Sequence, residues 1–210
     1  TNIIGNILTS TADFNVKIKP GFVDDNEEYG VIDGQVYQEV KNTPDFIDAF
    51  ENEDIDMVIL TGDINLNDLT MRASEDKILK VAKGREFTID LGGYKLSTTS
   101  TQTGKNYDMF DVRGTLNVKN GTIEYEHKGE NMGWSASTCI FNITAGGVLN
   151  LEGVTAKNLG GSDMAFVAHL NNWGKVTLNV ENSTLESNYV PVRVFNSGPD
   201  MNNVTIKNST

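Results

Sequence analysis

The sequence predicts an all-β fold, a parallel β-helix solenoid with a short capping helix near its N-terminus, and three observations support this prediction. The first is a hexapeptide that recurs along the last three fifths of the chain: an apolar residue, any residue, Gly or Asn, any residue, usually Thr, and an apolar residue. Its starts lie 21 to 33 residues apart, a spacing typical of a solenoid whose coils share a core but differ in loop length. The copies are LGGYKL from Leu91, VKNGTI from Val118, LEGVTA from Leu151, VENSTL from Val180 and MNNVTI from Met201.

The second observation is a series of short apolar runs between turns rich in Gly and Asn. Each predicted coil holds a first strand, a turn, and a second strand that ends in the hexapeptide. Strands of this kind pair with their equivalents one coil away, in the same direction and about 4.8 Å apart. Gly or Asn at the third position of the hexapeptide fits a left-handed backbone, and the following Thr fits a strand. The runs include KILKVA, FTIDLGGYKL, DMFDV, LNVKNGTIEYE, CIFNI, VLNLEGVTA, MAFVAHL, VTLNVENSTL and VPVRVF.

The third observation is the composition, with 38% hydrophobic residues and many Gly, Asn and Thr, as the thin core of a stacked coil requires. The net charge is −12, and no Lys/Arg cluster offsets it, so the sequence excludes nucleic acid as a partner. The single cysteine, Cys139, allows no internal disulfide, and its apolar neighbours predict a buried side chain. No apolar run is long enough for a membrane span.

The chain divides into two predicted parts. Residues 1–42 lack the repeat and form an N-terminal extension with strands in FNVKIKPGF and YGVIDGQVYQEV, whereas residues 43–210 form the solenoid. Thr43 is the expected N-cap and Pro44 the first helical residue of an amphipathic helix over residues 43–53. A helix of two turns is unstable alone, and across the first coil it would cover apolar side chains and open strand edges.

LTGDINLNDLTM, KILKVAKGREFTIDLGGYKLS and the repeated N-x-T-apolar steps resemble the opening coils of right-handed parallel β-helix proteins of the pectin-lyase-like superfamily. The resemblance covers about residues 43–210 and is strongest to bacterial secreted or surface members, which implies an extracellular or cell-surface location. This group includes polysaccharide lyases, glycoside hydrolases, tailspikes and adhesins, so the resemblance implies a fold more than an activity. The N-T-D, D-D, H-G and R-I-K series of polygalacturonases is absent from this chain.

Aligning the first strands by their apolar residues predicts one outward row of side chains. The inward set is Phe110, Val112, Phe141, Ile143, Phe166, Ala168, Leu170, Val192 and Val194. The outward row on one exposed sheet is then Asp111, Arg113, Asn142, His169 and Arg193.

Asp111, His169 and Arg193 are the candidate catalytic residues of this row, with Arg113 and Asn142 as ligand-binding residues. The resemblance implies the role of Arg193, because lyases of this fold use an arginine on such a strand to abstract a proton beside a carboxylate. Two alternatives stay open: an ion pair of Arg193 on a solvated face, and an inward His169.

Aromatic residues outside the core pattern are Tyr107, Trp134, Trp173 and Tyr189. The last three are the predicted ligand-binding residues, as platforms for a sugar ring. The alternative is that each Trp closes a loop over the core. No cofactor is predicted, and calcium is left open. DINLND resembles the start of an EF-hand loop, but Asp68 replaces the required Gly and Ser74 the required Glu. The calcium-binding carboxylates of pectate lyases are represented in the outward row by Asp111 alone.

The leading hypothesis is a secreted or cell-surface module that binds a polysaccharide or surface glycan, or mediates adhesion, without catalysis. The first alternative is a polysaccharide lyase or glycoside hydrolase acting on an acidic glycan, and the second is a structural stalk. The sequence reaches Thr210 directly after the last hexapeptide. We therefore expect either that the natural chain continues or that the uncapped coil pairs end to end with another molecule.

Overall fold

The computed structural model shows a β-solenoid of about four turns with one short helix, which confirms the predicted fold class. It describes residues 16–18, 29–66, 77–100, 108–128, 138–161, 164–171, 174–195 and 202–210. Trp134 and Trp173, two of the predicted ligand-binding residues, lie outside the described residues. In the described part of the chain, no helix has the length and apolar character needed to cross a membrane.

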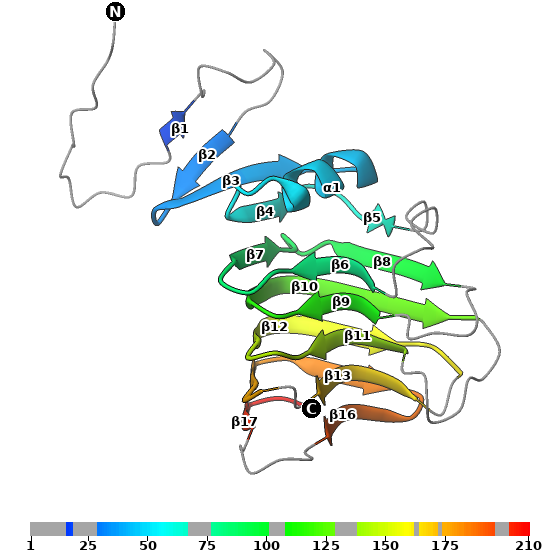
Figure 1. Cartoon of the computed structure of the whole chain (residues 1–210). Helices are drawn as coiled ribbons and strands as arrows, with labels where there is room; N and C mark the ends of the chain where they lie inside the picture. The colour runs from blue at the N-terminus through cyan, green and yellow to red at the C-terminus, as the bar shows by residue number, and fades with distance from the viewer. Residues whose placement is uncertain are drawn as a thin grey trace, which may run out of the picture.

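Two sheets of parallel strands form the walls of the solenoid (Figure 1). The five-stranded sheet consists of β6 (Lys77–Val81), β9 (Asp108–Val112), β11 (Thr138–Ile143), β13 (Ala165–Asn171) and β16 (Val190–Phe195). The large sheet stacks β4 (Met57–Leu60), β7 (Glu86–Asp90), β10 (Thr115–His127), β12 (Val148–Asn158), β14 (Thr177–Glu181) and β17 (Asn203–Lys207). Its second limb adds β5 (Ile64–Asn65), β8 (Lys95–Ser100) and β15 (Thr184–Ser187), which pair with β8, β10 and β12, respectively.

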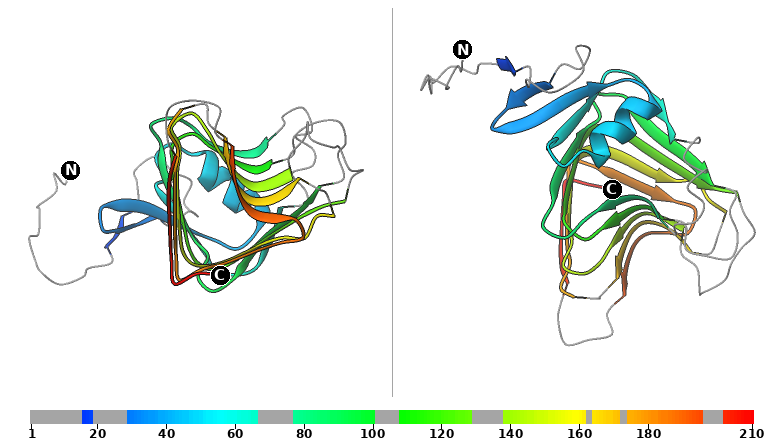
Figure 2. Two further views of the ribbon diagram at one scale, coloured as in Figure 1. Left: turned by 90° about the horizontal axis from the view of Figure 1, so that it is seen from below. Right: turned by 45° about the horizontal axis from the view of Figure 1, so that its top comes forward.

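The N-terminal strands join the large sheet. β1 (Val16–Ile18), β2 (Tyr29–Ile32) and β3 (Gln35–Val40) pair antiparallel in sequence, and β3 then pairs parallel with β4. Helix α1 (Thr43–Glu51) follows and lies across the end of the stack, as both views in Figure 2 show. Its buried face consists of Phe46, Ile47, Ala49 and Phe50.

Asn42 caps α1, so the prediction of Thr43 as the N-cap was wrong by one residue. The Asn42 side chain accepts a hydrogen bond from the Asp45 N–H at 3.0 Å. Thr43 instead donates its hydroxyl to the Asn65 carbonyl at 2.7 Å. Both residue types suit an N-cap, and the contact with the next coil decides which one takes that position.

The hexapeptide turns through a left-handed backbone at its third position, with φ of 60° at Asn120, 62° at Gly153 and 50° at Asn182. The register corrects two copies. Ile89 and Leu96 pair with Val118 and Ile123, so the first copy carries two extra residues. 

The last copy starts at Ile206 and not at Met201, because Ile206 pairs with Val180 and Asn208 has a φ of 48°. In MNNVTIKNST, Met201 and Ile206 each precede an Asn by two positions. Only the pairing with β14 shows which of the two starts the hexapeptide.

A ladder of asparagines runs along the outer face of the large sheet and was not predicted. Asn150 donates its side-chain amide to Asn117 at 2.7 Å, and Asn179 donates to Asn150 at 2.8 Å. Each side-chain amide therefore donates a hydrogen bond to the asparagine of the preceding coil. These bonds stabilise the parallel register from outside the core.

Candidate functional site

The predicted outward row is aligned in the structure. Asp111, Asn142, His169 and Arg193 occupy equivalent positions of β9, β11, β13 and β16. At about 4.8 Å per coil, Asp111 lies roughly 10 Å from His169 and 14 Å from Arg193 between their Cα atoms. The row therefore brings His169 next to Arg193 and leaves Asp111 apart.

The prediction that this row is exposed was wrong for three of its members. Asp111, Asn142 and His169 are only 2%, 3% and 7% exposed. The Asp111 carboxylate accepts a hydrogen bond from Arg113 Nε at 2.9 Å. Each of the three lies between the paired residues of the coils on either side. The alternation of inward and outward residues along one strand does not show this burial.

Phe166 was predicted to face inward and instead lies outside the main core. It packs with Cys139, Met164 and Val190 in a separate cluster. The reason is an interruption of the alternation in β13, where the consecutive Val167 and Ala168 both belong to the main core. Cys139 is buried, as predicted, and its thiol lies 2.8 Å from Asp108 Oδ1.

Phe166 is the centre of what we call the ring cluster, which comprises Phe166, His169, Tyr189, Arg193 and Phe195. The Phe166 ring lies 5.4 Å from the His169 ring and 5.8 Å from the Tyr189 ring, centroid to centroid. The Arg193 guanidinium carbon is 5.3 Å from the ring centroids of both Phe166 and Phe195. Tyr189 and Phe195 are 43% and 44% exposed. Three of the predicted site residues thus meet around one phenylalanine.

Arg193 lies over the faces of two aromatic rings. Within the described residues it forms no ion pair, so the ion pair considered from the sequence is not observed there. A guanidinium over ring faces directs its N–H groups outward in its own plane, where they can donate to a ligand. His169 is buried, and its ring lies beside that of Phe166.

The described residues do not fit a calcium site on this sheet. They contain no group of three or more His, Cys, Asp or Glu side chains placed to hold a metal ion. Asp111 is the acidic member of the row, and Arg113 already neutralises it. Calcium prefers six to eight oxygen ligands, including several carboxylates.

Comparison with family models, curated proteins and solved structures finds no match for this chain. The sequence identified His169, Tyr189 and Arg193 but missed Phe166 and Phe195. Phe195 could have been found, because it lies two residues after Arg193 on the same strand and therefore on the same face.

Proposed function

We propose that this chain is a non-catalytic β-solenoid module that binds a polysaccharide or surface glycan through the ring cluster and acts outside the cell or on its surface. The observation that carries the proposal is the contact of Arg193 with the rings of Phe166 and Phe195, with the exposed Tyr189 packed against Phe166. Exposed aromatic rings stack on the apolar face of a sugar, and the guanidinium donates to its hydroxyl or carboxylate groups.

Glycan binding is best tested with matched tyrosine variants. Tyr189→Ala should weaken binding to a responsive glycan by roughly 3- to 10-fold, the value expected of one lost ring contact. Tyr94→Ala removes a similarly exposed tyrosine from a hexapeptide turn and should leave binding unchanged. A panel of neutral and acidic polysaccharides in affinity electrophoresis would provide the ligand. Equal effects of the two variants, or no binding to any glycan, would contradict the proposal.

An enzymatic function is the alternative, and the alignment of Asp111, His169 and Arg193 in one row favours it. A lyase or hydrolase would release products from an acidic glycan, and Arg193→Ala would abolish turnover while binding persists. A binding module would release no product, and Arg193→Ala would weaken binding instead. A stalk would neither bind nor cleave.

We also propose that β16 and β17 mediate end-to-end association with a second copy. Among the described residues they are the last strands of their sheets, and their exposed apolar residues are Val194, Phe195, Val204 and Ile206. Exposed strand edges with apolar side chains favour pairing with another chain. Sedimentation should show concentration-dependent dimers that Ile206→Lys removes, and a chain that is monomeric at every concentration would exclude this association.

A further inference from the structure

Two exposed aromatic side chains lie at opposite ends of β16. Tyr189 directly precedes Val190, the first residue of the strand, and Phe195 is its last residue. At about 3.3 Å per residue of extended chain, the Cα atoms of Val190 and Phe195 lie roughly 16 Å apart. Tyr189 is 43% exposed and Phe195 is 44% exposed, so each end of the strand offers one accessible ring.

The two rings contact different members of the ring cluster. Tyr189 packs against Phe166, with 5.8 Å between the ring centroids, whereas the Phe195 ring centroid lies 5.3 Å from the Arg193 guanidinium carbon. Phe166 is only 1% exposed, so it supports Tyr189 and Arg193 and is itself out of reach of a ligand. The accessible part of the cluster is therefore two separate rings, with Arg193 between them in the strand.

Backbone hydrogen bonds hold both ends of β16 in place. Ser187 Oγ accepts a hydrogen bond from the Tyr189 N–H at 3.1 Å and donates to the Ala165 carbonyl at 2.6 Å. At the other end, Phe195 pairs with Asn171 of β13. The preceding coil thus sets the spacing of the two rings, and the backbone does not bring them together around one small ligand.

The row that runs down the stack does not extend this accessible surface. Asp111, Asn142 and His169 are at most 7% exposed, whereas Arg193 is partly exposed. Arg193 belongs both to that row and to β16. The surface open to a ligand therefore follows β16, across the solenoid axis, and does not follow the axis itself.

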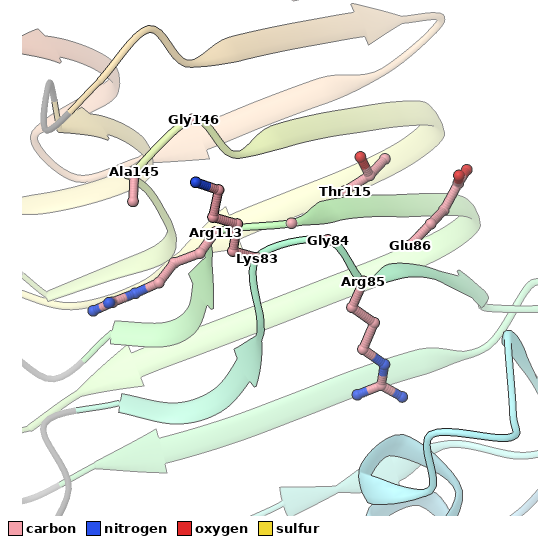
Figure 3. Close-up of a pocket in the computed structure, with 9 residues that line it drawn as sticks. Lys83, Gly84, Arg85, Glu86, Arg113, Thr115, Ala145 and Gly146 are labelled. Atoms are coloured by element: carbon pink, nitrogen blue, oxygen red, sulfur yellow. The ribbon is translucent and has the colours of Figure 1, made fainter.

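A hollow of about 360 Å³ at another edge of the solenoid provides a contrast (Figure 3). The described residues that line it include no aromatic side chain. Arg85 and Arg113 extend away from it in Figure 3, and Lys83 is the remaining cation among its labelled residues. A sugar has no ring to stack on there, so this hollow serves as a control surface.

We propose that the ring cluster binds an internal segment of a linear glycan, with one sugar stacked on Tyr189 and another on Phe195. This inference rests on the proposed glycan-binding function and adds the length and the direction of the ligand. A pyranose ring is about as wide as a phenyl ring, so one sugar covers only one of the two aromatic rings. Arg193 donates hydrogen bonds to the sugars that connect them.

A series of oligosaccharides of increasing length tests this inference. The probes are cello-oligosaccharides and oligogalacturonides, from the monosaccharide to the hexasaccharide, in isothermal titration calorimetry. The affinity of the natural chain should rise with length until one ligand covers both rings, and then stay constant. Tyr189→Ala and Phe195→Ala should each weaken hexasaccharide binding by about 3- to 10-fold and reduce its advantage over the monosaccharide. Tyr189→Phe keeps the ring and should retain that advantage.

Tyr94→Ala, at a similarly exposed tyrosine, and Lys83→Gln, at the hollow in Figure 3, are the controls and should leave the length dependence unchanged. Equal affinities for the monosaccharide and the hexasaccharide, or a loss with only one of the two alanine variants of the cluster, would overturn the two-ring inference while glycan binding stands. An equal loss in a control variant would overturn it as well. Absence of binding to either series would exclude the proposed function together with this inference.

Discussion

One row of inward-facing side chains runs the length of the solenoid, and it is buried at the first end and exposed at the last. The row runs from Val58 and Ile89 through Val118, Leu151 and Val180 to Ile206. Its members are buried as far as Val180, whereas Ile206 is 51% exposed. At the first end α1 covers the stack, and among the described residues no further coil packs on β17. Burial in this fold thus requires a neighbour on each side, in addition to an apolar residue at the correct position.

The largest expected effect is at the covered end. The Phe50 ring lies 4.9 Å from the Phe87 ring and 6.4 Å from the Phe110 ring, centroid to centroid. Phe50→Ala should therefore lower the free energy of unfolding by about 3–5 kcal/mol, measured by urea denaturation. Phe195→Ala, at the other end, should change it by about 1 kcal/mol or less. A loss for Phe50→Ala as small as that for Phe195→Ala would show that α1 does not stabilise the stack.

A matched pair of isoleucines sharpens the comparison, because Ile89 and Ile206 occupy the same row. Ile89→Ala should lower the free energy of unfolding by about 2–4 kcal/mol, since the cavity lies between packed coils. Ile206→Ala should cost about 1 kcal/mol or less, because half of its side chain is already in solvent. Thermal unfolding of the two variants at one concentration measures the difference, and a larger loss at Ile206 would mean that the end is covered in solution.

The smallest effect concerns the start of α1. Asn42→Ala removes the side chain that accepts from the Asp45 N–H and should lower the free energy of unfolding by about 1 kcal/mol. Thr43→Ala removes only the exposed hydrogen bond to Asn65 and should cost about 0.5 kcal/mol. A larger loss for Thr43→Ala than for Asn42→Ala would instead identify Thr43 as the N-cap.

The fold was predictable in outline because each strand has a buried face. A slip of one residue would expose a whole apolar row, so the apolar residues alone align Asp111, Asn142, His169 and Arg193 correctly. The same reasoning failed at Phe166, where two consecutive inward residues interrupt the alternation. It also failed at the last hexapeptide, where two starts fit the pattern and only pairing with β14 distinguishes them.

The candidate sites were less predictable. Their residues come from separate coils, and side-chain accessibility depends on neighbours about 30 residues away in the sequence.

Apart from Phe166 and the last hexapeptide, the amino-acid sequence by itself determined the inward alternation of the strands and the left-handed turns between them, because hydrophobic burial and backbone turns act on short segments. Tertiary structure alone decided which outward side chains are accessible, which asparagines form a ladder, and where the Arg193 guanidinium meets aromatic rings. These properties arise between coils, where distances of about 5 Å join residues that the chain separates by a whole turn.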